Sequence, residues 1–340
     1  MIRFATIGTN FITTRFLEAA KTCSCLKYAC AYSRNEETAA SFALWHHAGR
    51  YETDLSALAS APDIDAVYIA SPNRFHCSQA ILMMEHGKHV LCEKPAASNS
   101  RELAAMIESS KRNGVVFLEA MRSVFDPGFT AIKDHLPMLG TIRRASFQYC
   151  QYSSRYDKFK AGIVENAFDP NLSNGSLMDI GVYCVHPLVA LFEMPERIHG
   201  EALLLENGID GSGTILASYP GMQAELVYSK ISDSLVPSQI QGEEGTMTIR
   251  EIADPREITI RLRNGKTEQI SVEKESGNMI YEIQEWARLI ENGLSAEPYN
   301  RFTRMELMVM DEARRQMGIV FPADREDPVK KIQFRKGEEQ

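Results

Sequence analysis

The stretch Val90-Leu91-Cys92-Glu93-Lys94-Pro95 joins an apolar run to a charged pair and ends at a proline. Proline fixes its own φ angle, lacks a backbone N–H and disfavours the helical conformation for the residue before it. Lys94 should therefore end a strand in an extended conformation. In an open α/β sheet, ligands bind outside the carboxyl ends of the strands. Taken alone, this stretch fits a ligand-facing lysine and a surface lysine in a turn equally well.

The segments around this stretch alternate between short apolar runs and amphipathic helices. Such alternation is typical of a parallel, doubly wound sheet, so we predict a Rossmann-type α/β domain over residues 1–121. The predicted strands cover residues 2–7, 26–32, 66–70, 89–92 and 115–118.

The pattern changes after Met121. A predicted helix at 129–139 leads into a long strand at 141–152, and another helix spans roughly 176–192. From 197 to 271, strands follow one another through tight turns such as Asn207-Gly208, and strands joined in this way pair antiparallel. Helices at about 279–291 and 303–317 follow. We expect residues 122–340 to form an α+β domain for substrate binding and oligomerisation, with an open, mostly antiparallel sheet that exposes an apolar face.

Composition limits the possible functions. The chain has 340 residues, of which 44% are hydrophobic and 24% charged, with a net charge of −8. This acidic balance argues against nucleic acid as a partner. No apolar run approaches the roughly 18 residues of a membrane span, and no signal sequence is recognisable at the start. Seven cysteines without a C-x-x-C pair favour reduced thiols, so we expect a cytoplasmic protein without a membrane or metal site.

The turn after the first predicted strand reads Gly8-Thr9-Asn10-Phe11-Ile12-Thr13. A dinucleotide-binding turn usually reads G-x-G-x-x-G or G-x-G-x-x-A here, and only the first glycine is present. Asparagine tolerates positive φ better than other non-glycine residues, and amides at a helix start can bind a pyrophosphate. We therefore predict that a dinucleotide is bound by Gly8, Thr9, Asn10, Phe11 and Ile12.

The second predicted strand ends in Tyr32-Ser33-Arg34. An NAD-preferring site usually has Asp or Glu at this strand end to bind the ribose 2′-hydroxyl. A hydroxyl and a guanidinium instead suit a 2′-phosphate, through charge-assisted hydrogen bonds. We therefore favour NADP over NAD, with Ser33 and Arg34 in the cofactor site, although a solvated arginine is the alternative.

Four further segments form a recognisable series. The segments are Ser71-Pro72-Asn73 with His76, Glu93-Lys94-Pro95, Glu119-Ala120-Met121, and 174–183, which includes Asp179 and Tyr183. They resemble successive motifs of the Gfo/Idh/MocA oxidoreductases, the relatives of glucose–fructose oxidoreductase and inositol dehydrogenase. The resemblance covers the N-terminal domain and the first half of the second, and the last segment is similar to the family's G-G-x-L-x-D-x-G-x-[HY].

The resemblance implies both a fold and a site. It implies a Rossmann domain, an open sheet whose face often serves as an oligomer interface, and a Lys-Pro bond that is frequently cis. Lys94 matches the catalytic lysine, Asp179 the conserved carboxylate and Tyr183 the acid/base position, at which many members have histidine. A tyrosine there resembles the glucose–fructose oxidoreductase and dihydrodiol/xylose dehydrogenase branches, which use NADP. We add to the cofactor site Ser71, Asn73, His76, Glu93, Lys94 and Arg122, reading His76 chiefly as a structural hydrogen-bonding residue.

The chain departs from the family pattern at four positions. Asn10 and Thr13 replace a glycine and a small residue of the first turn, and Asn174 replaces the first glycine of the later segment. Arg122 stands where related branches often have an aromatic residue, so contacts with substrate or nicotinamide should differ there.

The chemistry can also be argued from the residues. Moving a hydride between an alcohol carbon and nicotinamide requires a group that takes the hydroxyl proton. A tyrosine, with a pKa of about 10, is too weak a base unless a neighbouring cation lowers that pKa, and Lys94 could supply the charge. Asp179 and Tyr183 are four residues apart and should share one helical face, where the carboxylate could bind substrate. The alternative for Asp179 is a charge favoured by the helix dipole.

Three functions are compatible with this pattern. The first is an NAD(P)-dependent dehydrogenase or reductase acting on a sugar, polyol or related diol. The second is a dinucleotide-binding regulator without turnover, and the third a redox-assisted glycosidase or lyase. Lys94 and Tyr183 together favour an enzyme, and we expect a homodimer or a larger homo-oligomer.

Overall fold

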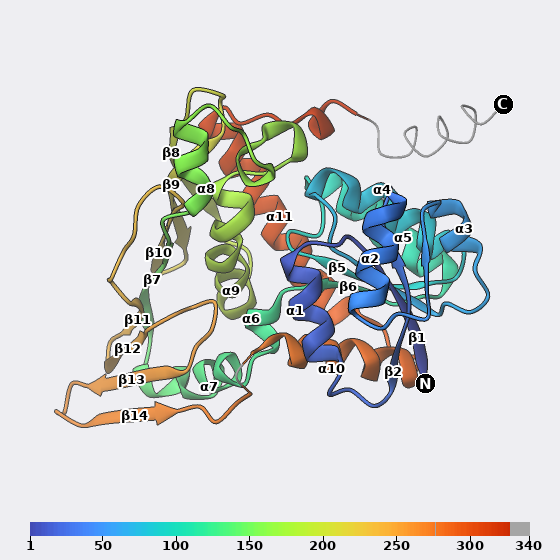
Figure 1. Ribbon diagram of the computed structural model, residues 1–340. Helices are drawn as coiled ribbons and strands as arrows, with labels where there is room; N and C mark the ends of the chain where they lie inside the picture. Colours follow the sequence, from blue (N-terminus) through green and yellow to red (C-terminus); the bar gives the residue numbers. More distant parts are fainter. Residues whose placement is uncertain (276, 327–340) are drawn as a thin grey trace. The chain divides into compact units, whose positions relative to one another are not determined.

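The computed structural model describes residues 1–275 and 277–326, and these form two compact units (Figure 1). Unit 1 contains residues 1–120, 279–304 and the described residues from Ala323 on. Unit 2 contains residues 121–278 and 305–322.

Unit 1 is built on a parallel sheet with the strand order β3-β2-β1-β4-β5-β6. The order reverses between β1 and β4, which is the switch point at which doubly wound sheets bind ligands. The predicted Rossmann fold is confirmed, with β3 as an unpredicted strand at the edge. The strands are β1 (Ile2–Ile7), β2 (Leu26–Tyr32), β3 (Arg50–Glu52), β4 (Ala66–Ile69), β5 (His89–Glu93) and β6 (Phe117–Ala120).

The helices of unit 1 bury aromatic and aliphatic side chains against this sheet. Phe16 stacks on Tyr68 of β4 with a ring-centroid distance of 3.7 Å, and both side chains are fully buried. Stacking of this kind adds to the stabilisation that burial of the two rings provides. The helices are α1 (Phe11–Ala20), α2 (Glu36–Trp45), α3 (Leu55–Ser60), α4 (Asn73–Glu85), α5 (Ser100–Asn113) and α10 (Met279–Glu291), with α11 (Glu297–Met317) contributing its residues up to Arg304 and the 3₁₀ turn η5 (Pro322–Asp324) those from Ala323 on.

The division of the chain differs from the boundary expected at residue 121, because residues 279–304 and the described residues from Ala323 on belong to unit 1. The C-terminal helix α10 belongs to unit 1 and not to the unit that precedes it in the sequence. Its apolar face, with Ile283 and Trp286 fully buried, packs against α1 and β6. A helix with one apolar face must cover a core, and the core available to α10 is that of the parallel sheet.

Unit 2 is built on a sheet with the order β14-β13-β12-β11-β7-β10-β9-β8. In the described part of the chain, β7 and β10 pair in parallel and the other neighbours pair antiparallel, as expected for a mostly antiparallel sheet. The strands are β7 (Ile142–Cys150), β8 (Arg197–Leu204), β9 (Asp210–Tyr219), β10 (Met222–Ser229), β11 (Ser238–Gly242), β12 (Gly245–Ile249), β13 (Glu257–Leu262) and β14 (Thr267–Ser271).

Helices cover the inner face of this sheet. The α-helix α9 packs against β7 and β10, where Phe147 and Leu226 are fully buried. The helical segments of unit 2 are α6 (Arg122–Phe125), α7 (Pro127–His135), α8 (Ser154–Lys160), α9 (Val182–Phe192), the 3₁₀ turns η1 (Leu136–Leu139), η2 (Asn166–Phe168) and η3 (Pro170–Leu172), the π turn η4 (Leu177–Gly181), and α11 from Met305 on.

The outer face of the sheet is polar, so the expectation of an exposed apolar face was wrong. Successive side chains of a strand point to opposite faces, and the apolar ones point toward α9. A row of paired positions crosses the whole outer face, and its members are polar except Leu216. The row runs His199, Leu216, Glu225, Ser146, Gln239, Thr248, Thr259 and Gln269.

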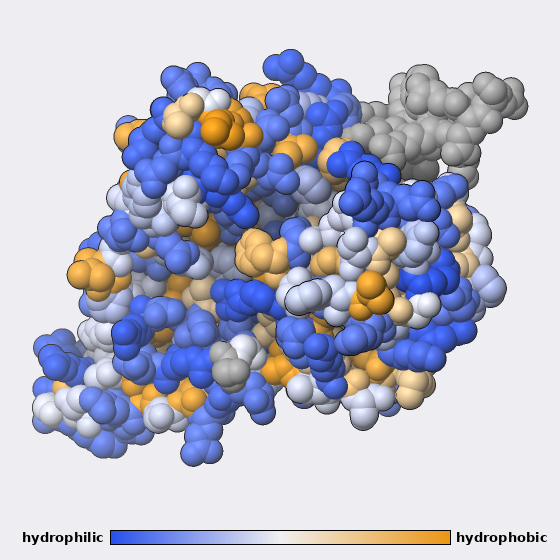
Figure 2. Space-filling model, in the orientation of Figure 1, coloured by the Kyte–Doolittle hydropathy of each residue, from blue (hydrophilic) through white to orange (hydrophobic). Residues whose placement is uncertain are grey.

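None of the helices within residues 1–275 and 277–326 has the length and hydrophobicity needed to cross a bilayer. On the face drawn in Figure 2, hydrophilic residues predominate and hydrophobic residues are scattered. None of the seven cysteines, all of which lie in the described residues, forms a disulfide.

The segment before α9 is the π turn η4, not the first turn of the α-helix predicted over 176–192. π turns occur frequently at functional sites. Asp210, at the start of β9, is 1% exposed and accepts a hydrogen bond of 2.6 Å from the Leu177 amide. A methyl group on Gly175 would lie 2.2 Å from Asp210 Oδ1, so glycine leaves room for the carboxylate that caps η4.

The Asp210 carboxyl should make stability depend on pH. Burial raises its pKa to about 7, even though the Leu177 and Ser176 amides and the Lys230 charge favour the ionised form. The pKa of Asp210 is higher in the folded state than in the unfolded state, so the protonated carboxyl stabilises the fold. This stabilisation is complete below about pH 4 and is lost as the pH rises through about 7. Asp210→Asn keeps an acceptor for Leu177 but removes the titration. In urea titrations, the free energy of unfolding of the wild type should fall between about pH 5 and pH 8. In Asp210→Asn that fall should be smaller by roughly 1–3 kcal/mol.

The control for this prediction is Asp134→Asn, which changes an exposed aspartate of α7 in the same unit. It should keep the pH dependence of the wild type. An Asp210→Asn variant with the same pH dependence as the wild type would contradict the prediction.

Candidate active site

Lys94 lies directly after the carboxyl end of β5, in a turn whose backbone is fixed on both sides. The Lys94–Pro95 peptide bond is cis. The Ala96 amide donates a hydrogen bond of 2.8 Å to Glu119 Oε1, and the Lys94 amide donates one of 3.3 Å to Glu93 Oε2. The lysine side chain is half-buried, as a residue at the rim of a ligand site would be.

Glu119, near the end of β6, holds this turn in place through its hydrogen bond with the Ala96 amide. Its side chain is 2% exposed, and its second oxygen accepts a hydrogen bond of 2.9 Å from the Thr303 hydroxyl. A buried carboxylate is tolerated where its oxygens are hydrogen-bonded. The glutamate of the Glu119-Ala120-Met121 segment therefore has a structural role, which is to hold the backbone that follows Lys94.

His76 joins the end of β4 to the same turn. Its Nε2 lies 2.7 Å from the Ser71 carbonyl oxygen and its Nδ1 lies 3.1 Å from the Pro95 carbonyl oxygen. Full burial lowers the pKa of His76, against the opposite effect of the two carbonyls. A neutral imidazole has one N–H, so it donates to one of these oxygens at a time. This geometry agrees with the structural reading of His76.

The first turn of unit 1 brings α1 close to the end of β4. Gly8 has a φ of 115°, and a methyl group there would lie 2.7 Å from the Ala70 carbonyl oxygen. Asn10 is the N-cap of α1: its Oδ1 accepts from the Ile12 and Thr13 amides, and its Nδ2 donates to the Ala70 oxygen at 2.8 Å.

These contacts correct the reasoning about Asn10. We expected asparagine to serve the turn through a positive φ, but its φ is −88° and the positive φ belongs to Gly8. Asn10 acts through its side chain, which occupies the Ile12 and Thr13 amides that we had expected to face a pyrophosphate. The neighbouring Thr9 is half-buried, and Phe11 is exposed.

The other predicted cofactor residues follow β2 and β4. Ser33 is half-buried after β2, and Arg34 is exposed, with its guanidinium carbon 5.9 Å from the centre of the Phe75 ring. The Ser71 hydroxyl donates to Gln79 at 2.6 Å, and Asn73 is buried at the start of α4. Glu93 accepts a short hydrogen bond from the Tyr68 hydroxyl. Because the strands are parallel, the residues after β1, β2, β4 and β5 share one edge of the sheet.

This edge fits a bound dinucleotide. Gly8 carries no side chain where the chain turns into α1, so the turn can lie directly against the end of β4 at this edge. The N-terminus of α1 favours negative charge, and the exposed Arg34 offers a cation at the end of β2. The predicted residues at the ends of β1, β2, β4 and β5 could hold the cofactor in unit 1, and their assignment stays a prediction.

Asp179 and Tyr183 lie in unit 2, on η4 and on the first turn of α9. The Asp179 carboxylate forms an ion pair with Lys230, a lysine that is 3% exposed and lies 5.2 Å from the centre of the Phe168 ring. Tyr183 is 7% exposed and contacts the Tyr149 ring edge-to-face at 5.7 Å. Asp179 therefore has a cation partner of its own.

Arg122 also lies in unit 2, at the start of α6. Its Nε donates to the Tyr183 hydroxyl at 3.2 Å, and its guanidinium carbon lies 5.0 Å from the centre of the Tyr183 ring. We had assigned Arg122 to the cofactor site, and the structure places it against the predicted acid/base residue. Lys230 was missed altogether, because a lysine after a strand carries no local motif that marks it.

Comparisons with known proteins agree with this architecture. Residues 2–121 match a family described as an oxidoreductase family with an NAD-binding Rossmann fold, and residues 137–248 match the GFO/IDH/MocA C-terminal domain. The chain is 51% identical to the scyllo-inositol 2-dehydrogenase (NADP(+)) of Bacillus subtilis (strain 168), over 95% of this chain and 99% of that protein. It is 29% identical to the trans-1,2-dihydrobenzene-1,2-diol dehydrogenase of Mus musculus, over 86% and 88%.

A solved structure shares the fold. A 3-ketoreductase from Actinomadura kijaniata, in complex with NADP and TDP-benzene, superposes with a TM-score of 0.84 at 19% identity, covering 93% of this chain and 98% of that one. The family matches span most of the sequence, and the Bacillus subtilis relative aligns over nearly all of it. The chain belongs to the Gfo/Idh/MocA family of oxidoreductases.

Proposed function

We propose that this chain catalyses hydride transfer between NADP and a CH–OH carbon of a polyol, sugar or related diol, with NAD as a weaker cofactor. The observation that carries the proposal is the 51% identity to a dehydrogenase whose name specifies scyllo-inositol and NADP(+). The mouse relative acts on a cyclic diol by its name, which points to the same class of substrate. Cyclic polyols are therefore the first substrates to test.

The proposed mechanism assigns one task to each residue. In the oxidation direction Tyr183 takes the proton of the reacting hydroxyl, and in reduction it returns that proton. Lys94 donates a hydrogen bond to the reacting oxygen. Asp179, held by Lys230, accepts a hydrogen bond from another substrate hydroxyl. The dinucleotide, when bound, supplies the nicotinamide that exchanges the hydride.

The preference for NADP rests on the end of β2. Ser33 and Arg34 stand where an NAD-preferring site has an acidic residue, and an exposed guanidinium can bind a 2′-phosphate. Ser71, Asn73 and Glu93 complete the proposed cofactor site, with His76 supporting it through the Ser71 carbonyl.

Assembly and location are part of the proposal. We propose a cytoplasmic homodimer or larger homo-oligomer that associates through the outer face of the unit 2 sheet. Several members of the row across this face are uncharged, and they are easier to desolvate than charged side chains would be. Leu216, which is 51% exposed near one end of the row, offers an apolar contact. Cysteines without disulfides suit a reducing compartment.

Lys94→Ala and Tyr183→Phe test the mechanism. Each should lower the rate of NADP reduction with scyllo-inositol, myo-inositol, aldoses or cyclic diols by about 10²–10⁴-fold, the usual contribution of acid/base catalysis. The double variant should be little slower than either single variant, because the two residues act as a unit. Nicotinamide absorbance gives the rates, and cofactor titration checks that Tyr183→Phe still binds NADPH. Full activity of Tyr183→Phe would contradict the mechanism, and a panel without turnover but with ligand-induced stabilisation would favour the regulator.

Arg34→Ala tests the cofactor preference. The wild type should bind NADPH more tightly than NADH, and loss of a charge-assisted contact of about 1.5–3 kcal/mol should reduce NADPH affinity about tenfold or more. NADH affinity should change little. Fluorescence titration of both cofactors gives the ratio, with Arg112→Ala, an exposed arginine of α5, as the matched control. A wild type that prefers NADH, or an unchanged ratio in Arg34→Ala, would overturn the assignment.

Leu216→Arg tests the assembly. If the outer face is an interface, an arginine at the exposed Leu216 should weaken association by placing a charge in it. Sedimentation velocity at micromolar concentration should show a dimer or larger species for the wild type and a smaller one for the variant. Leu235→Arg, at a position 99% exposed and outside the sheet, is the control and should sediment like the wild type. A monomeric wild type would refute the proposal.

A further inference from the structure

Arg122 is the cation that the structure of unit 2 brings to the Tyr183 hydroxyl. Its Nε donates to that oxygen at 3.2 Å, and its guanidinium carbon lies 5.0 Å from the ring centre. A guanidinium donating to a phenol oxygen makes a stronger hydrogen bond when the phenol is deprotonated, because the bond then joins opposite charges. Arginine is suited to this task because it keeps its charge throughout the pH range of an enzyme.

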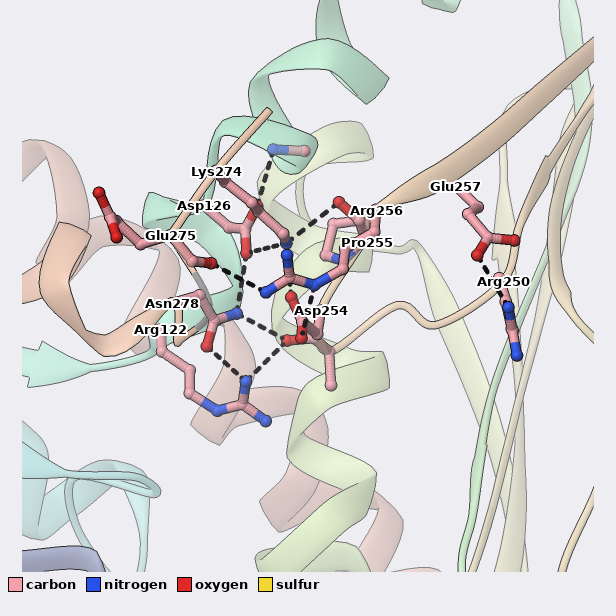
Figure 3. A network of polar contacts seen from close by, with 12 residues as sticks. Arg122, Asp126, Arg250, Asp254, Pro255, Arg256, Glu257, Lys274, Glu275 and Asn278 are labelled. Atoms are coloured by element: carbon pink, nitrogen blue, oxygen red, sulfur yellow. Dashed lines mark hydrogen bonds and ion pairs between the residues drawn. The ribbon is translucent and has the colours of Figure 1, made fainter. Parts of the chain in front are cut away.

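The guanidinium is held in place by a second set of bonds. Arg122 Nη1 donates to Asn278 Oδ1 at 2.6 Å and to the Ala253 carbonyl oxygen at 3.2 Å (Figure 3). Both acceptors are neutral, so they fix the orientation of the guanidinium without adding a countercharge. Asn278 is 1% exposed, and its Nδ2 donates in turn to Asp126 Oδ2 at 2.8 Å.

Behind Asn278 lies a buried network of charges. The Lys274 side chain is fully buried and bonds Asp126, Asp254 and the Pro255 carbonyl (Figure 3). Although burial alone would raise it, the pKa of Asp254 is lowered by Lys274, Arg256 and Arg122. A buried network whose members are hydrogen-bonded to one another holds its geometry rigidly. It therefore fixes Asn278, which orients Arg122.

Two further ionisable side chains of unit 2 lie near Tyr183, one by contact and one by its place on the helix. Tyr149 of β7 contacts its ring edge-to-face, and Asp179 lies one turn earlier on the same helical stretch. The Asp179 carboxylate is paired with Lys230, which follows β10. The negative charge nearest to Tyr183 in sequence, that of Asp179, is thus paired with the buried Lys230. The guanidinium that donates to the phenol oxygen belongs to Arg122.

We propose that Arg122 is a positioning residue for Tyr183, which orients the phenol and stabilises its deprotonated form, and that the Asn278–Asp126–Lys274 network fixes Arg122 for this role. The inference rests on the proposed acid/base role of Tyr183. In oxidation, the substrate O–H bond breaks, the proton goes to the Tyr183 oxygen, and the hydride leaves the substrate carbon for the nicotinamide. In reduction the proton travels back, and Arg122 stabilises the phenolate that remains.

A titration without substrate tests the role of Arg122 directly. Tyrosinate absorbance is recorded against pH for the wild type minus Tyr183→Phe, and for Arg122→Met minus the double variant. Each difference isolates the Tyr183 phenolate. We expect the Tyr183 signal to move to higher pH by about one unit or more when Arg122 is replaced, equivalent to roughly tenfold in the ionisation constant. Coinciding curves would overturn the inference, whatever the enzyme's substrate is.

The pH–rate profile gives the second readout. In Arg122→Met the rise of kcat/KM with pH should move upward by the same amount, so activity below the transition falls about tenfold or more and recovers at higher pH. Arg122→Lys, which keeps the charge but loses the planar fork, should lie between the two. NADPH affinity should stay within about twofold of the wild type. A loss of activity equal at every pH, or a loss of cofactor binding, would show that Arg122 acts in another way.

Arg250→Met is the matched control. Arg250 lies in the same unit, is also drawn in Figure 3, and pairs with Glu257 at the surface, where both side chains are 67% exposed. Its replacement removes the same charge and should leave both titrations unchanged. A shift as large as that of Arg122→Met would mean that net charge, not the contact with Tyr183, sets the titration. If Tyr183→Phe is active but the Arg122 shift is present, the proposed function fails while the electrostatic coupling stands.

Discussion

The parallel pairing of β1, β2, β4, β5 and β6 is the constraint on which the chemistry of unit 1 depends. Parallel strands end at one edge, so residues from distant parts of the chain meet there. The turn after β5 then needs a rigid support, and Glu119 from the end of β6 provides it by accepting the Ala96 amide. His76 adds a link from the end of β4. The hydrogen bonds that position the backbone at Lys94 are therefore made by Glu119 and His76.

Unit 2 buries two lysine side chains, each of which forms an ion pair. Lys274 and Lys230 are both almost inaccessible to solvent, and each is paired with aspartate. Burying a charge without a partner costs several kcal/mol, so these pairs are required wherever the lysines are buried. The result is a set of fixed charges in unit 2 that would not have to reorganise if Tyr183 exchanges a proton as proposed.

Much of this architecture could be predicted from the sequence because it follows from local patterns. The apolar runs of unit 1, the helix at 279–291 and the Lys94–Pro95 turn each have a signature a few residues long. Other features have no such signature. β3 is too short to show periodicity, and the π turn η4 differs from an α-helix by one hydrogen-bond step. The partnerships Lys230–Asp179 and Arg122–Tyr183 join positions 51 and 61 residues apart, so only the fold reveals them.

The neutral state of His76 has a consequence for the turn that follows Lys94. Burial keeps the pKa of this imidazole below its ordinary value, so the link between the ends of β4 and β5 needs no countercharge at neutral pH. The turn that follows Lys94 is therefore tied to the end of β4 by an uncharged side chain, and no buried carboxylate has to be spent on neutralising that link.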